Sequence, residues 1–187
     1  KKTGEYRKAT YGDIVILTRS LKGWTDVFLR ILSQEGVPAY SISKEGYFET
    51  REIQLLLNYL RILDNPRQDI PFAAVLVSQF AGITSEELAL IQSTASGKNL
   101  YDKIVEYVQL GDHVQLVMKL SAFLRYYDGF RAMIPYTAIH ALLWQIVERT
   151  GYGHYVAALP GGEQRTANVD MLIEKAIRFE STSYKGL

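Results

Sequence analysis

The chain contains one Gly-Lys pair, Gly97-Lys98, which is the part of the sequence most similar to a phosphate-binding loop. Such a loop needs glycines that let backbone amides converge on phosphate, followed by Lys and then Ser or Thr. Here Gln92 occupies the position of the leading glycine, and Asn99 follows the lysine. The pair is therefore interpreted as a turn, and no nucleotide-binding loop is predicted.

Acidic and histidine residues also lack the spacing of common metal and hydrolase sites. No Asp or Glu is followed by Lys two positions later, a spacing that metal-dependent nucleases of the restriction-enzyme type use. The histidines His113, His140 and His154 are far apart and form no HExxH motif, and no GxSxG turn occurs. We therefore predict no catalytic residue, no metal site and no cofactor site within these 187 residues.

Two further groups favour a structural interpretation over a functional one. Glu86 and Glu87 follow Thr84 with the spacing of a capping box, and carboxylates are favourable at the start of a helix. His140 and Trp144 lie one turn apart on a predicted helix, where they could flank a ligand. A packed pair at a helix–helix contact is the favoured interpretation.

A cluster of cationic and aromatic residues surrounds Tyr127. With Arg125 and Arg131 nearby, it could stack on unpaired bases while the cations contact phosphates. The alternative is an amphipathic helix in which Tyr127 packs inward and the arginines stay solvated. We favour the second arrangement.

The composition is that of a globular protein with little net charge. Hydrophobic residues make up 48% of the chain, and 21 Lys and Arg residues against 20 Asp and Glu residues give a formal net charge of +1. Because no overall field attracts nucleic acid, any DNA contact has to be local. Zero cysteines exclude disulfides and thiolate zinc sites. No apolar run reaches the ~20 residues that span a bilayer, so we expect no membrane association and a cytoplasmic location.

Residues 12–66 predict a β-α-β-α unit. The segment 13–18 is a short apolar run rich in β-branched residues, which is typical of a buried strand. An amphipathic segment that ends at Gly36 predicts a helix, and Pro38 then precedes a second strand at 39–43. A strand, a crossover helix and a strand in this order indicate a parallel pair in a Rossmann-like or RecA-like sheet.

Helical periodicity dominates the rest of the chain. A leucine-rich stripe predicts a helix that ends at Asn65-Pro66. No strand is predicted beyond it, and helices are expected at 69–79, 84–94, 99–109, 112–128, 136–149 and 164–180. The predicted fold class is an α/β fragment, a small parallel β-α-β piece, followed by a larger all-α domain, with mostly α structure overall. The chain begins without Met, and we expect it to be a piece of a longer polypeptide.

The junctions within residues 12–66 resemble those of UvrD-like superfamily 1 helicases. In that family an arginine ends the first strand, the phrase G(I/V)P opens the second, and an aromatic pair with an acid precedes EI in a leucine-rich helix. The matching residues here are Arg19, Gly36 to Pro38, Tyr47-Phe48-Glu49 and Glu52-Ile53. The resemblance implies that residues 1–66 are part of the second RecA-like motor domain and that residues 67–187 are the all-α insertion domain.

Two later passages, 76–88 and 161–187, are similar to AddA-type subunits of bacterial ATP-dependent helicase/nucleases. This resemblance implies a longer protein that hydrolyses ATP with magnesium, moves along single-stranded DNA, and unwinds and trims broken duplex ends for recombinational repair. It also implies a partner, a second subunit of the AddB type. The ATP, magnesium and nuclease sites would lie outside these residues, so the segment alone is predicted to be inactive.

The resemblance also suggests where DNA is contacted. The end of the first strand faces the DNA channel in the family, so Arg19 and Ser20 are candidates for contacts to the single-strand backbone. For Arg19 the alternative is simple solvation of a strand end. Gly82 and Thr84 are candidates for duplex contacts, because the family's insertion domain approaches duplex through a turn before a helix.

Two other functions fit the same residues. One is a UvrD-like repair helicase without a nuclease, and the other is a helical protein–protein interaction module, which the balanced charge and the aromatic-rich helical half also favour. The predicted sheet would leave an unpaired strand edge, so self-association of the isolated segment is expected.

Overall fold

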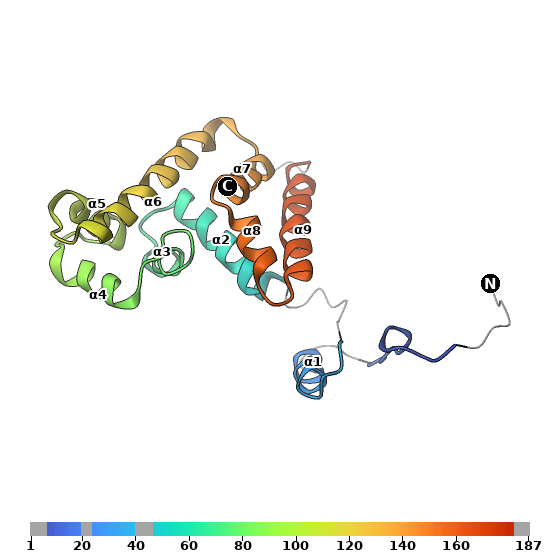
Figure 1. The fold of residues 1–187 in the computed structure, drawn as a ribbon. Helices are drawn as coiled ribbons and strands as arrows, with labels where there is room; N and C mark the ends of the chain where they lie inside the picture. The colour runs from blue at the N-terminus through green and yellow to red at the C-terminus, as the bar shows by residue number, and fades with distance from the viewer. Residues whose placement is uncertain (1–6, 20–23, 40–46, 182–187) are drawn as a thin grey trace. The chain divides into compact units, whose positions relative to one another are not determined.

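Helices make up all the regular secondary structure of the described residues, which are 7–19, 24–39 and 47–181 of a computed structural model. The chain divides into two compact units, residues 1–48 and residues 49–187. In chain order the elements are η1 (Tyr11–Asp13), α1 (Thr25–Gln34), η2 (Tyr47–Glu49), α2 (Arg51–Asp64), α3 (Asp69–Leu76), α4 (Ser85–Thr94), α5 (Leu100–Leu110), α6 (Val114–Met133), η3 (Ile134–Tyr136), α7 (Ile139–Arg149), α8 (Tyr152–Ala158) and α9 (Gly162–Glu180), where η denotes a 3-10 helix (Figure 1).

The strand predicted at 13–18 is not formed. Residues 14–18 have no regular secondary structure, and the side chains of Ile14, Val15 and Leu17 are 64%, 75% and 90% exposed. A strand is stable only when a neighbouring strand accepts and donates its backbone hydrogen bonds. The second predicted strand, 39–43, falls largely on residues 40–46, which lie outside the described residues. The described residues are therefore mostly α, as predicted, but without the β-α-β piece.

The helix between the two expected strands is confirmed, together with its end. Gly36 follows α1 with a φ of +70°, the left-handed conformation predicted for it. The Val37 N–H donates to the Leu32 carbonyl at 2.8 Å, which is the hydrogen bond of a Schellman motif. Glycine is favoured at this position because a side chain there would strain the backbone.

In the second unit, α2 contacts α3, α6 and α9, which are far apart in the sequence (Figure 1). The predicted leucine-rich helix is confirmed, and its most buried face includes Tyr59 and Ile62 beside the leucines. The side chains of this face that are at most 1% exposed are Ile53, Leu56, Tyr59, Ile62 and Leu63, which recur every three or four residues, apart from the adjacent pair at 62 and 63. Their burial makes α2 the central helix of the unit.

The compact units and the predicted domains divide the chain at different points. Because of its contacts with α3, α6 and α9, α2 belongs to the unit that begins at residue 49. The predicted division into 1–66 and 67–187 concerns which residues belong to a motor domain and which to an insertion domain. That assignment stays a prediction.

Aromatic rings fill the space between α2, α3 and α6. Tyr127 of α6 is fully buried and lies 5.7 Å from Phe72 and 6.0 Å from Phe123, measured between ring centroids. Its hydroxyl donates to the Ile62 carbonyl at 2.8 Å. Burial raises the pKa of Tyr127 to about 12, so the hydroxyl stays a proton donor. The prediction that Tyr127 packs inward is confirmed.

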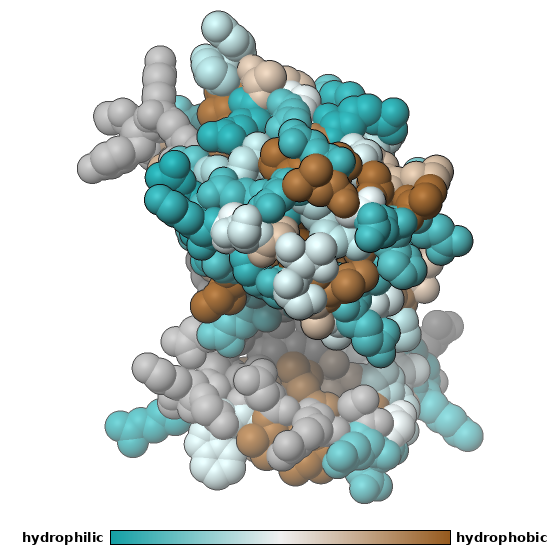
Figure 2. Space-filling model, turned by 90° about the vertical axis from the view of Figure 1, so that its left-hand side faces the viewer, coloured by the Kyte–Doolittle hydropathy of each residue, from teal (hydrophilic) through white to brown (hydrophobic). Residues whose placement is uncertain are grey.

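The surface carries apolar side chains among polar ones (Figure 2). On α5 and α6, the exposed apolar residues include Leu110, Val114 and Met118, at 71%, 71% and 66% exposure. Single apolar residues at a protein surface are common and do not by themselves indicate a function. Among the described residues, no helix combines the length and apolar character needed to cross a membrane.

Tyr127→Phe is expected to lower the unfolding free energy of the chain by about 1 kcal/mol, because it removes a satisfied buried hydrogen bond. The measurement is urea denaturation followed by the far-ultraviolet helix signal.

Tyr59→Phe is the matched control, since the buried Tyr59 hydroxyl has no hydrogen-bond partner among the described residues. Removing it is expected to leave stability unchanged or slightly higher. Equal losses in the two variants would contradict the role given to the Tyr127 hydroxyl.

Candidate functional site

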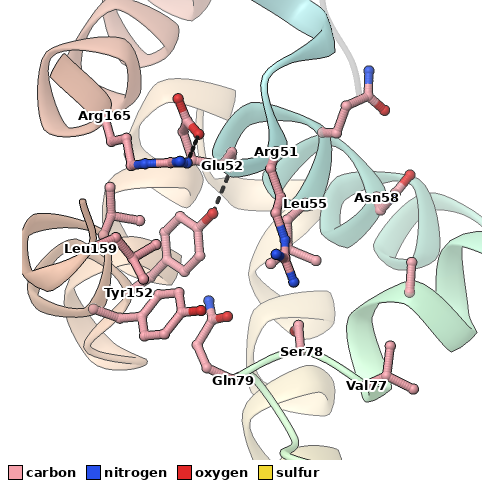
Figure 3. A pocket seen from close by; sticks show the side chains of 14 residues that line it. Arg51, Glu52, Leu55, Asn58, Val77, Ser78, Gln79, Tyr152, Leu159 and Arg165 are labelled. Atoms are coloured by element: carbon pink, nitrogen blue, oxygen red, sulfur yellow. Dashed lines mark hydrogen bonds and ion pairs between the residues drawn. The ribbon is translucent and has the colours of Figure 1, made fainter. Parts of the chain in front are cut away.

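The first turn of α2 contains a buried acid, Glu52, whose side chain is 4% exposed. One carboxylate oxygen accepts a hydrogen bond from Arg165 Nη1 and the other from Asn168 Nδ2, both at 2.7 Å. The Tyr152 hydroxyl donates to the Glu52 backbone carbonyl at 2.7 Å (Figure 3). A buried carboxylate is tolerated when its oxygens are matched in this way.

The partners of Glu52 come from α8 and α9, about one hundred residues further along the chain. Arg165 and Asn168 are three positions apart on α9, so they lie on one face of that helix. Tyr152 is the first residue of α8 and follows Gly151, which has a φ of +69°. These contacts fix the start of α2 against α8 and α9.

A cavity of about 330 Å³ lies beside this network. Its walls come from α2, α3, α8, α9 and the segment 77–79 between α3 and α4 (Figure 3). The polar residues of the wall are Arg51, Glu52, Gln54, Asn58, Ser78, Gln79, Tyr152, Tyr155 and Arg165. Sequence analysis missed this cavity, because its residues come from five separate stretches of the chain with no common spacing.

The hydrogen bonds and charges of the cavity wall are those of the described residues alone. Among the described residues, no group of three His, Asp or Glu side chains could hold a metal ion. Glu52, the one acid that the described residues contribute to the cavity wall, is hydrogen-bonded to Arg165 and Asn168. No base and nucleophile are paired there in the hydrogen bonds described.

Of the two residues predicted to contact single-stranded DNA near the end of the first expected strand, the structure describes only Arg19. Arg19 is exposed and follows the irregular segment 14–18. Ser20 lies outside the described residues. The predicted contacts of Arg19 and Ser20 with a DNA backbone stay predictions.

Gly82 and Thr84 lie in the turn that enters α4. Gly82 has a φ of +63°, and its N–H donates to the Ser78 carbonyl at 2.7 Å. Thr84 forms the predicted capping box, because its hydroxyl accepts from the Glu87 N–H at 3.1 Å while its own N–H donates to Glu87 at 2.8 Å. The capping box is confirmed, whereas contacts of Gly82 and Thr84 with duplex DNA stay predictions.

Glu87 also joins α4 to α6. Lys119 Nζ lies 2.8 Å and 3.0 Å from its two carboxylate oxygens. The hydrogen bond from Lys119, and after it the bond from the Thr84 N–H, lower the pKa of Glu87 below its usual range. One carboxylate therefore serves both a local cap and a contact between helices.

The turn predicted at Gly97-Lys98 is a bend at Lys98 in the connection between α4 and α5, and the Gly97 amide is already occupied. The N–H groups of Ser96 and Gly97 donate to Glu106 of α5 at 3.0 Å, and the Ser96 hydroxyl does so at 2.9 Å. A Cβ at Gly97 would come within 2.6 Å of the Lys103 backbone nitrogen, so glycine is required by close packing. The turn holds a carboxylate of the chain itself in place of a phosphate.

The predicted pairing of His140 and Trp144 is only half right. His140 contacts α9, where its ring Nδ1 lies 2.5 Å from Glu180 and its N–H donates to the same carboxylate at 3.0 Å. Trp144 is 52% exposed and is not part of a packed core. His140 is thus a link between α7 and α9.

Comparison with known protein families shows which family the chain belongs to. Residues 2–160 match the family described as the UvrD-like helicase C-terminal domain. The chain belongs to this family. The match includes residues of both compact units, among them Glu52, Tyr152 and most of the cavity wall.

Curated relatives extend the similarity over the full chain. The AddA subunits of the ATP-dependent helicase/nucleases of Acetivibrio thermocellus and Clostridium acetobutylicum are each 42% identical to it over 187 residues, covering all of this chain and 15% of each relative. The corresponding protein of Lachnoclostridium phytofermentans is 35% identical over 234 residues, covering all of this chain and 17% of the relative. The chain therefore spans about one sixth of the length of these relatives, and the predicted resemblance to AddA-type helicases is confirmed.

Glu52→Ala is expected to lower the unfolding free energy by about 2–4 kcal/mol, because it removes the acceptor for Arg165 and Asn168 inside the protein. Urea denaturation of the chain measures this change. Glu148→Ala on the exposed side of α7 is the control and is expected to change stability by less than about 0.5 kcal/mol. Similar losses of unfolding free energy in the two variants would contradict a stabilising role for the Glu52 hydrogen bonds.

Glu87→Gln is expected to make the unfolding free energy fall less steeply as the pH is lowered into the acid range. The folded pKa of Glu87 lies below the unfolded value of about 4.3, so its contribution is complete above that pH and is lost as pH falls through the folded pKa. Urea denaturation at a series of pH values from 7 to about 3 tests this. Glu86→Gln removes the same charge from the same turn, and an equal flattening there would contradict the assignment to Glu87.

Proposed function

We propose that this chain is a segment of an ATP-dependent DNA helicase/nuclease subunit that unwinds and resects double-stranded DNA ends for recombinational repair. The observation that carries the proposal is the similarity of the whole chain to the AddA subunits of ATP-dependent helicase/nucleases. In this proposal the ATP, magnesium and nuclease sites and the contact with a second, AddB-type subunit belong to other parts of a longer cytoplasmic protein. The segment contributes surface that contacts and positions DNA.

The proposal includes a role for the exposed apolar segment 14–17. In the longer protein it would be a strand of the second RecA-like domain, with residues 1–66 in the motor and 67–187 in the insertion domain. The exposure of Val15 and Leu17, at 75% and 90%, supports burial against a partner, because a run of β-branched and leucine side chains is costly to leave in water. In the isolated chain the same segment would favour self-association.

A helicase without nuclease activity would have the same UvrD-like domain. The relatives are named as subunits of helicase/nucleases, which favours the helicase/nuclease. A pure protein–protein interaction module is less well supported, because the similarity runs through the residues expected in the motor domain as well as the helical ones.

DNA contact is proposed at two places. Arg19 and Ser20 would bind the backbone of the single strand, with the Arg19 guanidinium as a forked donor to phosphate. Gly82 and Thr84 would approach the duplex through the turn before α4. The carboxylates of Glu86 and Glu87 stand in the same turn, so contacts there would have to come from backbone groups.

In the longer protein, Arg19→Ala is expected to weaken binding to single-stranded oligothymidylate. Loss of one phosphate contact is expected to reduce the slope of log affinity against log salt by about 0.7. Fluorescence anisotropy over a salt series measures both quantities, with Arg67→Ala, another exposed arginine, as the control.

An unchanged slope in Arg19→Ala would contradict the proposed contact. A fall in ATP hydrolysis with unchanged DNA affinity would also contradict it and would assign Arg19 to the nucleotide site. If the unaltered protein neither hydrolyses ATP in the presence of DNA nor unwinds a duplex, the proposed function itself is wrong.

A further inference from the structure

The cavity beside the Glu52 network contains hydrogen-bond donors that no described residue uses. Arg51 is exposed and has no ion pair among the described residues, and its guanidinium points into the cavity (Figure 3). The Gln79 side-chain nitrogen is buried and has no acceptor among them. A buried donor without an acceptor costs free energy, so it indicates a missing partner. The exposed Arg51 guanidinium adds a second donor beside the buried Gln79 nitrogen, and a ligand with several acceptor atoms would match both.

The charge of the cavity wall favours an anionic ligand. Within the described part of the chain, Glu52 is the one acid in the wall, and both of its oxygens already accept hydrogen bonds from α9. Arg51 is therefore left as a positive charge without a counterpart among the described residues. A guanidinium binds phosphate oxygens in a forked geometry that suits this position.

The aromatic and apolar part of the wall favours a planar ring. Tyr152 already stacks on Phe80, with ring centroids 4.9 Å apart and an interplanar angle of 15°. Tyr155, one turn further along α8, is 39% exposed and so keeps surface available for stacking. The remaining wall is aliphatic and comes from Leu55, Ala74, Val77, Val156 and Leu159. A nucleobase suits such a wall, because every base offers a face for stacking.

The size of the cavity agrees with a small ligand. Its volume of about 330 Å³ lies at the lower end of the range of about 300–1,000 Å³ for sites of small molecules. It suits one planar base with its sugar and phosphate. A folded peptide segment would need a longer groove.

We propose that this cavity binds one nucleotide of single-stranded DNA. The phosphate contacts Arg51, the base packs against Tyr155, and an acceptor on the base edge receives a hydrogen bond from the Gln79 amide. This assignment rests on the proposed function, since a DNA helicase is the source of the strand. It adds a strand-binding position within the helical unit, whose wall includes the segment 77–79 just before Gly82 and Thr84.

Photocrosslinking in the longer protein tests the assignment. An oligothymidylate containing 5-iododeoxyuridine is crosslinked, and the modified tyrosines are mapped by mass spectrometry. Tyr155 is expected to be a crosslinked residue. Tyr136 is the internal control, because at 89% exposure it would react more than Tyr155 if exposure alone decided the yield.

Two variants separate binding from folding. Arg51→Ala is expected to lower the Tyr155 yield about tenfold, which corresponds to one charge-assisted hydrogen bond, while Arg67→Ala leaves it unchanged. Gln79→Leu is expected to lower the yield about three- to tenfold without lowering the melting temperature, because it removes a donor that is unmatched in the folded chain. A damaged fold would instead lower both the crosslinking yield and the melting temperature.

The outcomes distinguish this inference from the proposed function. DNA binding and unwinding without a Tyr155 crosslink, or a crosslink insensitive to Arg51→Ala and Gln79→Leu, would overturn the inference alone. Absence of DNA binding by the unaltered protein would overturn both. If excess free thymidine monophosphate abolishes the Tyr155 crosslink while total DNA binding persists, the cavity is a site for a free nucleotide and not for a strand.

Discussion

The burial of the Glu52 carboxylate constrains the whole helical unit. A charge in that position is tolerated only with donors on both oxygens, and the chain supplies them from α9, more than one hundred residues away. The Tyr152 hydroxyl adds a third contact, from α8 to the backbone of the same residue. The first α-helix of the unit and its last two therefore have to assemble together, and α3 and α6 also pack against α2.

The same constraint shapes the cavity. Because Glu52 turns inward to α8 and α9, its neighbour Arg51 lies at the cavity wall and keeps its charge available (Figure 3). The segment 77–79 closes the opposite side and brings the buried Gln79 amide with it. A single DNA strand is the ligand that we propose for this cavity, and that proposal depends on the proposed function.

Local signals in the sequence predicted local structure well. The capping box at Thr84, the left-handed Gly36 and the inward face around Tyr127 each depend on residues close together in the chain. The helix α8 escaped prediction, because it has seven residues and includes Gly153, a poor helix former. The strand predicted at 13–18 is not formed for a different reason: its stability depends on a partner strand, which local periodicity cannot supply. The Glu52 contacts and the cavity could not be predicted from the sequence either, because they join residues with no regular spacing.

The double use of Glu87 affects how the helical unit opens. Its carboxylate closes the first turn of α4 and also holds Lys119 of α6, so fraying at the start of α4 releases a contact on a second helix. A helix end held only by its own cap can open by itself, at little cost to its neighbours. Here α4 and α6 are linked through a single side chain, and their local opening is coupled into one cooperative step.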